Sequence, residues 1–476
     1  MARRFCSLLL LLVLCGGAVA LGAPAKKSAP PDEDYYELFK LLVDMMDQVE
    51  RNYVKDVDRR EMFEAAVEGV MGTLDPYSSY IKPKEISRFR STVDSHFGGI
   101  GVRVSVTQGK LTILSPVVGT PGYRAGLLSG DQIVEIDGES AEGLSIDDAV
   151  RRLKGKPGSK VTLAVIHPGT TKRVKIDVVR EIIHVSTVLG DTRKEDDTWE
   201  FMLKPEQHIG YVRITGFSRD TARETREVLD GLQKKKLRGL ILDLRFNPGG
   251  LLSSAIEVSD LFVSQGTIVS TEGRSSPKRE WNAEKKGTYE GFPMVVLVNR
   301  YSASASEIVS ACLQDHDRAV ILGERTWGKG SVQNVIELED GASALKLTTA
   351  SYRRPSGKNI HRFHGSKEED EWGVMPDDGF LVELGDAEMR GLVDDRRQRD
   401  VIQPHIDPDD PNDDPNDDPN DDPNDDESKN GGKDARPDEG ADEESENGDE
   451  SEEPALVDRQ LQKAVEYLVG ELARAE

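Results

Sequence analysis

Two short segments carry the residue types that nucleophilic catalysis requires: residues 302–307, with the sequence SASASE, and residues 323–330, with the sequence GERTWGKG. A serine hydroxyl is a weak nucleophile until a base accepts its proton. A lysine can act as that base only when burial makes its neutral amine accessible near neutral pH. We therefore predict that Ser304 is a nucleophile, that Lys329 is its base, and that both lie in a shared, partly dry cleft.

The segments around both residues predict how the fold positions them. Residues 293–298 are apolar and predict a buried strand, and residues 304–313 have helical spacing. Ser304 would then lie at a strand-to-helix turn, where a helix N-terminus favours the negative charge of an alkoxide or an oxyanion. Residues 319–322 are also typical of a strand, and Lys329 follows in a loop punctuated by glycines.

Other interpretations of these segments are weaker. Runs of small residues often reflect tight helix packing, and a lone lysine is usually a solvated charge. A phosphate-binding loop is a sharper alternative, because residues 323–329 match its Gly-x-x-x-x-Gly-Lys pattern. Gly330, however, stands where a Ser or Thr must ligate magnesium, and Ser331 comes one residue late. The pattern therefore favours a nucleophile and its base.

A third segment indicates an oxyanion site. Residues 239–245 predict a strand that breaks at 246–250, with the sequence FNPGG, before a helical pattern over 251–262. Paired glycines between a strand and a helix leave backbone N–H groups able to approach a ligand closely, as an oxyanion hole requires. For Gly249 alone, a tight turn that simply needs glycine remains an alternative.

Three strings together resemble the C-terminal processing peptidases, a family of serine–lysine endopeptidases also called tail-specific proteases. They are DLRFNPGG at 243–250, SASASEI at 302–308 and GKGSVQ at 328–333. The resemblance extends from about Tyr35 to Ile402 and resumes at Asp458, so it covers most of the chain.

The resemblance implies a role for each residue that matches the family pattern. Ser304 is the nucleophile and Lys329 the general base. Gln333, one helical turn beyond the lysine, orients it, and the backbone N–H groups of Gly250 and Ala305 hold the oxyanion.

Upstream, residues 97–102 (FGGIGV) predict a glycine loop entering a strand, and they resemble the carboxylate-binding loop of a PDZ domain. A helix opened by Ser145 would form a groove with that strand, and an extended C-terminus would bind there as an added strand. An ordinary hairpin is the alternative for a lone Gly-Gly-x-Gly. The predicted peptide-binding residues are Phe97, Gly98, Gly99, Ile100, Gly101 and Lys154.

Lys154 belongs to that set because of the resemblance. In this family the PDZ domain can gate the catalytic site, and a basic residue before the string GKPG at 155–158 helps to align it. An arginine is more usual there, and lysine lacks its planar, bidentate fork. Lys154 therefore cannot make the same gating contact that an arginine makes in the family.

The N-terminus predicts export. Arg3 and Arg4 precede the apolar run 8–14, and residues 18–20 (AVA) form a small-residue cleavage site, which is typical of a secretory signal peptide at 1–20. A retained membrane anchor and a lipoprotein signal at Cys15 are the alternatives. We expect a periplasmic or secreted protein, with peripheral membrane association left open. Cleavage would leave Cys312 as the single cysteine, without an internal disulfide.

Residues 35–70, within the N-terminal region 33–95, have helical periodicity, which we interpret as core packing without a site. The family resemblance adds that such N-terminal helices can contribute to a homodimer. The residues that define the periodicity are Leu38, Leu41, Leu42, Met45 and Met46.

The net charge of −25 is mostly local, because residues 406–454 hold 23 acidic and 3 basic residues. This stretch, with its repeats of PNDD, predicts a disordered spacer extended by self-repulsion. Calcium binding is an alternative, but the glycine and glutamate spacing of an EF-hand loop is missing. The rest of the chain has no basic stripe, so nucleic acid is not an expected partner. His361 and His364 lack other ligand-spaced groups, and no metal or cofactor is implied.

The expected fold is a multidomain α/β protein with a crotonase/ClpP-like β-α catalytic core and an inserted PDZ domain. The predicted parts are the signal peptide 1–20, the helical region 33–95, the PDZ domain 96–182, the catalytic domain 183–402, the acidic disordered insertion 403–454 and a C-terminal helix within 455–476. The predicted function is an exported serine endopeptidase that binds protein C-termini and cleaves through an acyl-enzyme. A PDZ-based peptide-binding scaffold with an inactive protease domain, and a crotonase-like acyl-thioester enzyme, are the alternatives.

Overall fold

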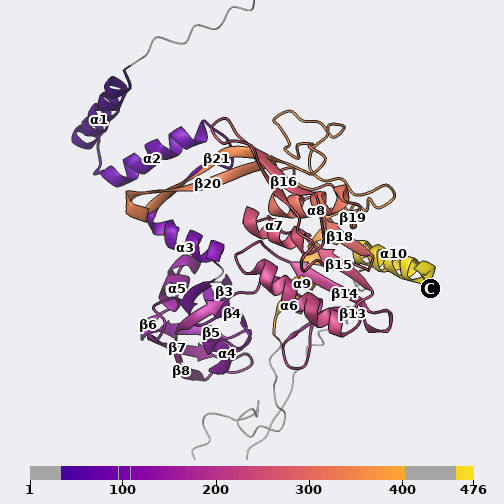
Figure 1. Ribbon diagram of the computed structural model, residues 1–476. Coiled ribbons are helices and arrows are strands. Elements are labelled where there is room, and N and C mark those ends of the chain that lie inside the picture. The colour runs from indigo at the N-terminus through magenta and orange to yellow at the C-terminus, as the bar shows by residue number, and fades with distance from the viewer. Residues whose placement is uncertain (1–33, 95, 108, 403–456, 476) are drawn as a thin grey trace, which may run out of the picture. The chain divides into compact units, whose positions relative to one another are not determined.

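The computed structural model describes residues 34–94, 96–107, 109–402 and 457–475, and the chain divides into two compact units, 1–73 and 74–476 (Figure 1). The predicted signal peptide and the predicted acidic insertion at 403–454 lie outside the described residues. Among the helices within these ranges, none is both long enough and apolar enough to cross a membrane.

The first unit contains helices α1 (Tyr35–Asn52) and α2 (Arg59–Gly72), capped by the side chains of Asp34 and Asp58. The predicted helical periodicity is confirmed, but the prediction of core packing is wrong for α1, in which no residue is buried. Two helices alone provide no second layer to cover an apolar stripe. The exposed side chains of α1 include Leu38, Leu41, Leu42 and Met45.

A small β-rich domain forms the N-terminal part of the second unit. Its sheet is antiparallel and has the order β3–β4–β5–β7–β8, with β6 paired to β5. Its core is apolar and fully buried at positions such as Ile113 and Leu163. The elements are β3 (Val102–Thr107), β4 (Lys110–Pro116), α4 (Pro121–Arg124), β5 (Gln132–Ile136), β6 (Glu139–Ser140), α5 (Ile146–Leu153), β7 (Lys160–Ile166) and β8 (Arg173–Val179).

The Ser145 hydroxyl accepts a hydrogen bond from the N–H of Asp148 at 3.2 Å, which confirms the predicted start of α5. The predicted glycine loop is in part a strand, because β2 (His96–Gly99) pairs with β9 (Glu181–His184). Residues 100 and 101 alone lie between β2 and β3.

The larger domain is built on a sheet with the order β10–β14–β15–β18–β19, and β13 also pairs with β14. Strands β14, β15, β18 and β19 run parallel, whereas β10 and β13 are antiparallel to β14. Their bounds are β10 (Val188–Leu189), β13 (Met202–Lys204), β14 (Ile209–Ile214), β15 (Gly239–Asp243), β18 (Met294–Val298) and β19 (Val320–Gly323).

Helices cover both faces of this sheet, so its parallel strands are almost entirely apolar and buried. On one face, Leu242 and Val296 pack with α6 (Thr221–Lys234), α7 (Leu252–Asp260) and α8 (Ala305–Asp315). On the other face, Ile241 and Val295 pack against α10 (Arg459–Ala475), which confirms the predicted C-terminal helix.

A second sheet, with the order β1–β21–β16–β17 and with β20 paired to β21, completes this domain. Its long hairpin β20–β21 projects from the body of the domain in Figure 1. The bounds are β1 (Ser79–Ile81), β16 (Thr267–Glu272), β17 (Arg279–Asn282), β20 (Ser331–Leu338) and β21 (Ser343–Arg353). The remaining elements are α3 (Pro83–Asp94), β11 (Thr192–Arg193), β12 (Trp199–Glu200), the 3-10 turns Pro205–Gln207 and Glu339–Gly341, and α9 (Asp386–Asp400).

Candidate active site

The three segments singled out in the sequence meet at one edge of the parallel sheet. Strands β15, β18 and β19 are neighbours and run in the same direction, so the loops after them leave from the same edge. The first loop carries Gly249 and Gly250, the second carries Ser304, and the third carries Lys329. The predicted strands and the helix after Ser304 are confirmed.

Neighbouring serines fix the turn that carries Ser304. The Ser302 hydroxyl donates to the carbonyl of Leu244 at 2.9 Å, and the Ser306 hydroxyl donates to the carbonyl of Asn247 at 2.9 Å. Both serines are fully buried. The run of small residues therefore packs tightly against the loop after β15, and this packing presents Ser304 to the site.

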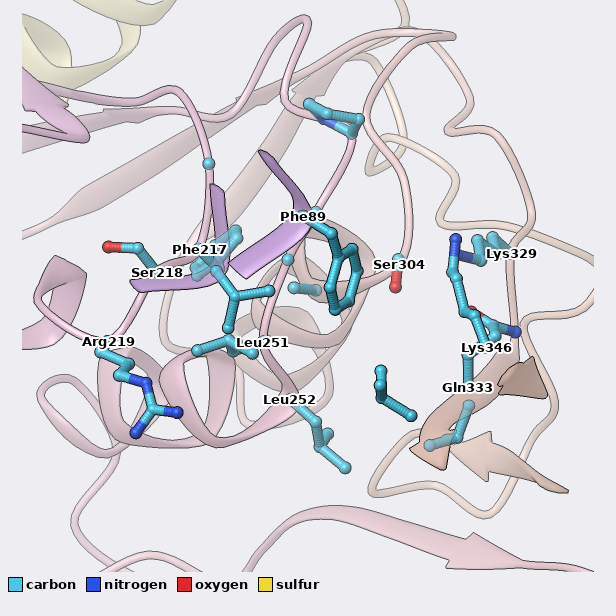
Figure 2. Close-up of a pocket in the computed structure, with 18 of the residues that line it drawn as sticks. Phe89, Phe217, Ser218, Arg219, Leu251, Leu252, Ser304, Lys329, Gln333 and Lys346 are labelled. Atoms are coloured by element: carbon cyan, nitrogen blue, oxygen red, sulfur yellow. The ribbon is translucent and has the colours of Figure 1, made fainter. Parts of the chain in front are cut away.

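Ser304 has a strained backbone at the N-cap of α8. Its φ is +56° and its ψ −112°, a conformation that L-residues rarely adopt. Such strain costs about 1–3 kcal/mol and is often found at functional positions. The N-terminus of α8 provides positive electrostatic potential at the same place. Figure 2 shows the Ser304 hydroxyl between the apolar side chain of Phe89 and the side chains of Lys329 and Lys346.

Lys329 is a partly buried amine in the same cavity. Burial, with a further contribution from the charge of Lys346, lowers the pKa of Lys329 to about 8, against the attraction of Glu307 and Asp75. A neutral amine is thus accessible close to neutral pH. The side chains of Ser304 and Lys329 make no direct hydrogen bond in the described part of the chain, so they must approach each other before proton transfer.

Glu307 holds the serine and lysine loops together. One oxygen of its fully buried carboxylate accepts from the Thr326 hydroxyl at 2.6 Å and the N–H of Gly328 at 2.7 Å. The other accepts from the N–H of Ser304 at 2.7 Å and of Lys329 at 2.8 Å. Burial raises the pKa of Glu307, and these four hydrogen bonds oppose that rise.

Tyr352 makes a second bridge between the same loops. Its buried hydroxyl lies within hydrogen-bonding distance of the carbonyl of Ser304, at 3.1 Å, and of the carbonyl of Lys329. Burial raises the pKa of this phenol well above its ordinary value, so it stays a neutral donor. Sequence reasoning assigned no role to Glu307, Tyr352 or Lys346. The Ser304-x-x-Glu307 spacing, which is that of a helix capping box, could have identified Glu307.

The predicted oxyanion donors, Gly250 and Ala305, both line the cavity beside Ser304. Among the described residues, neither N–H is used in a hydrogen bond. Phe217 pairs with the first loop through the carbonyl of Gly249 and the N–H of Leu251, and this pairing leaves the N–H of Gly250 unused. Glycine is required here, since a Cβ on Gly250 would lie 2.1 Å from the carbonyl oxygen of Phe217.

The expected position of Gln333 is wrong, because the residues after Lys329 form strand β20 and not a helical turn. The Gln333 amide donates to the hydroxyls of Ser331 at 2.9 Å and Thr348 at 3.1 Å. Gln333 lines the same cavity as Lys329. In the described part of the chain, its amide makes no hydrogen bond to the Lys329 amine. A strand at this place also removes the phosphate-loop alternative, which needs a helix after the lysine.

The cavity that contains these residues has a volume of about 900 Å³. Apolar side chains from α3 form one wall, and Lys329, Gln333 and Lys346 lie on the opposite side (Figure 2). Such a mixture of apolar walls and a few convergent polar groups is typical of a substrate site. The apolar residues include Ile86, Phe89, Val93, Leu252 and Ile308.

The predicted peptide-binding residues are brought together at the edge of the small domain. Phe97, Gly98 and Gly99 lie in β2, and the N–H of Gly155 donates to the carbonyl of Gly98 at 3.1 Å. The Lys154 amine lies over the Phe97 ring, 4.4 Å from its centroid. Burial lowers the pKa of Lys154, with a smaller contribution from Arg88.

Comparisons with known proteins define the class. Residues 208–377 match the model of peptidase family S41, residues 112–166 match that of the PDZ domain, and residues 22–85 match that of the activating protease CtpB N-terminal domain. The chain belongs to peptidase family S41, in the group of carboxy-terminal processing proteases that carry a PDZ domain.

Among individual relatives, the carboxy-terminal-processing protease of Bartonella bacilliformis is 35% identical over 78% of this chain and 83% of its own length. The carboxy-terminal processing protease CtpA of Bacillus subtilis is 35% identical over 74% of this chain and 72% of its own length. A solved structure of a photosystem II D1 C-terminal processing protease is 29% identical, with a TM-score of 0.40, and covers 72% of this chain and 92% of that one.

Proposed function

We propose that this protease is a serine endopeptidase that uses Ser304 as nucleophile and Lys329 as general base. The observation that carries the proposal is that Ser304, at the N-terminus of α8, and a lysine whose pKa is lowered to about 8 line one cavity. Family S41 membership supports it independently. The charge that develops on the substrate carbonyl would be held by the N–H groups of Gly250 and Ala305.

The reaction follows from these positions. Neutral Lys329 takes the proton as the Ser304 oxygen attacks the scissile carbonyl. The tetrahedral intermediate collapses as Lys329 returns the proton to the leaving amine, which leaves an acyl-enzyme on Ser304. Lys329 then deprotonates a water molecule that hydrolyses the ester, and the serine regains its proton. Glu307 and Tyr352 act as positioning residues, because they hold backbone groups of both loops.

The decisive experiment combines cleavage of an unfolded protein substrate with covalent labelling by a fluorophosphonate probe. Ser304→Ala should abolish both signals. Lys329→Ala should abolish cleavage and strongly slow labelling, whereas Lys286→Ala, at an exposed lysine, should leave both unchanged. Full cleavage by purified Ser304→Ala or Lys329→Ala would remove the proposed pair. Peptide binding without any labelling would favour the scaffold alternative.

We infer that the PDZ domain selects substrates by their C-termini. PDZ domains bind an extended C-terminal peptide as an added strand and capture its carboxylate. In this chain the candidate residues are Phe97, Gly98, Gly99, Ile100 and Gly101, with Lys154 packed on Phe97. Binding should be lost when the carboxylate of a tail peptide is amidated. Equal affinity for the free and amidated peptides in fluorescence anisotropy would contradict the inference.

We also propose export and self-association, each on a separate observation. Residues 1–20 have the composition of a signal peptide, so the mature protein should be found in a periplasmic or secreted fraction. Helix α1 exposes Leu38, Leu41 and Met45, which supports a homodimer or a peripheral membrane contact. The double variant Leu38→Glu/Leu41→Glu distinguishes the two roles. Loss of a dimer in sedimentation velocity supports the homodimer, and loss of vesicle binding by a protein that stays monomeric supports the membrane contact.

A further inference from the structure

A cluster of two histidines and an aspartate lies outside the catalytic cavity. His96 and His184 are cross-strand partners in β2 and β9, and Asp220 precedes α6. His96 Nε2 lies 3.3 Å from His184 Nδ1, and each of these atoms lies 3.6 Å from Asp220 Oδ2. Three potential ligand atoms from three separate segments therefore point to one place.

A carboxylate contacts the far side of the His184 ring and orients it. His184 Nε2 contacts Glu224, whose other oxygen accepts from the Ser186 hydroxyl and the N–H of Thr187, both at 2.9 Å. Because Glu224 contacts Nε2, Nδ1 is the His184 nitrogen that faces His96 and Asp220. A carboxylate behind a histidine is the usual second layer of a metal site.

The Asp220 oxygen that faces the histidines lacks a partner. Asp220 Oδ1 accepts from Arg223 at 3.0 Å, but Oδ2 is shielded from solvent and has no hydrogen-bond partner among the described residues. A buried carboxylate oxygen without a partner is costly, and it indicates a missing ion or water. Both histidine nitrogens lie 3.6 Å from this oxygen, within the range of an ion pair but too far for a hydrogen bond.

The spacing of the three atoms matches a tetrahedral metal ion. Ligand atoms at about 2.0–2.1 Å from a tetrahedral Zn²⁺ lie about 3.3 Å apart. Two imidazoles and a carboxylate form a ligand set that suits zinc and neighbouring divalent transition metals, while calcium and magnesium prefer oxygen ligands alone. We propose that His96, His184 and Asp220 bind a divalent transition-metal ion of the zinc class.

The ligands come from both folded domains, so the ion would connect them. His96 immediately precedes Phe97 of the candidate tail-binding segment, whereas Asp220 follows residues 217–219, which line the catalytic cavity. Phe217 in turn hydrogen-bonds the carbonyl of Gly249 at 3.0 Å. The bound metal therefore fixes the start of the PDZ domain to the segment that supports the candidate oxyanion loop.

The test is a Zn²⁺ titration of the full chain carrying Ser304→Ala, which prevents self-cleavage. Excess Ca²⁺ in the buffer competes with Zn²⁺ for the many carboxylates of residues 403–454. We expect one Zn²⁺ per chain by calorimetry, and a tetrahedral d–d absorption spectrum when Co²⁺ is used instead. His96→Gln, at the most exposed ligand, should weaken binding by at least about 100-fold, and Glu224→Gln by about 10–100-fold.

His364→Gln is the matched control, because His364 is exposed and outside the cluster, and it should bind Zn²⁺ like the parent. Hydrogen exchange should slow on Zn²⁺ binding in residues 96–99, 181–184 and 217–221 together. Unchanged affinity in both His96→Gln and His184→Gln, or the absence of a Zn²⁺ site in the parent, overturns the proposal. These measurements need no proteolysis, so they stand apart from the test of the catalytic pair.

Discussion

The carboxylate of Glu307 accepts a hydrogen bond from the backbone N–H of Lys329 at 2.8 Å. Glu307 therefore holds the Lys329 loop in place by its main chain. Because the same oxygen also accepts from the N–H of Ser304, the separation of the two loops depends on one buried group. The Lys329 amine lines the cavity together with Gln333 and Lys346 (Figure 2).

Glu307→Gln should reduce kcat/KM by about 100-fold, the scale expected when reacting groups are misplaced by about 1 Å. Glutamine has one acceptor oxygen, and its NH₂ group would face two N–H or O–H donors that now lack an acceptor. Each unsatisfied buried donor costs about 1–3 kcal/mol, so the melting temperature should also fall. Steady-state kinetics and calorimetry check this, with Glu257→Gln, exposed on α7, as the control. Activity within twofold of the parent would contradict the positioning role.

The lowered pKa of Lys329, to about 8, predicts a pH-dependent rate. Only the neutral amine accepts a proton, so kcat/KM should rise with pH and level off above about 8. A profile that is already flat from pH 6 to 9 would exclude Lys329 as the titrating base. The substrate must be a peptide whose affinity for the enzyme does not change between pH 6 and 9.

The same pKa shift predicts how stability depends on pH. The folded pKa lies below the ordinary value of 10.5, so between about 8 and 10.5 the unfolded chain binds a proton that the folded chain lacks. Stability contributed by this site should therefore rise with pH across that window and be lowest below about 8. In the Ser304→Ala background, Lys329→Met should remove this slope and raise the melting temperature at pH 7. Identical slopes in both proteins would contradict the assignment.

Much of the site could be predicted from sequence because its motifs are local. The strands before Ser304 and Lys329, the helix after Ser304 and the glycine turn at Gly250 follow from hydrophobic periodicity and turn residues. The role of Tyr352 could not be predicted, since it depends on β21 lying beside both loops. The expected helical turn between Lys329 and Gln333 is wrong because the glycine-rich start of this segment gives no local signal for helix or strand. Pairing with β21 makes the segment a strand.

The proposed metal ligands His96, His184 and Asp220 could not be predicted from the sequence either, because only the tertiary fold brings them together. His96 and His184 become neighbours only through the pairing of β2 with β9, and Asp220 reaches them from the start of another helix. Motif spacing can identify metal ligands only within one segment. It gave no metal site at His361 and His364, and it cannot detect ligands that come from three separate segments. The exposed apolar face of α1 likewise follows from tertiary packing, which periodicity does not determine.

A buried ion pair predicts that the C-terminal helix is essential to the stability of the catalytic domain. Arg245 is fully buried, and its guanidinium donates to both oxygens of Asp458 at 2.9 Å and to Asp243. Asp458→Ala leaves this charge with less compensation and should cost about 3–5 kcal/mol. Arg459→Ala, which breaks an exposed pair with Glu388, should cost about 0–1 kcal/mol. Chemical denaturation measures both, and equal losses would contradict the argument.

Gly249 has a φ of +101° and crowded surroundings, which together exclude a side chain. A Cβ there would lie 2.7 Å from the carbonyl oxygen of Ala303 and 2.8 Å from the Cβ of Ser304. Gly249→Ala must therefore push the glycine loop away from the serine turn, and with it the N–H of Gly250. We expect cleavage and fluorophosphonate labelling to fall by at least about 100-fold, since removal of one oxyanion donor alone costs about 100- to 1,000-fold.

The control for this substitution is Gly231→Ala, near the C-terminal end of α6, where a Cβ would meet no atom within 4 Å. Alanine is the better helix former, so this variant should gain up to about 1 kcal/mol and keep full activity. Thermal unfolding separates the two effects of Gly249→Ala, because a folded but unlabelled variant locates the defect at the oxyanion loop. Normal labelling of folded Gly249→Ala would show that the loop tolerates the displacement and that its N–H groups do not hold the oxyanion.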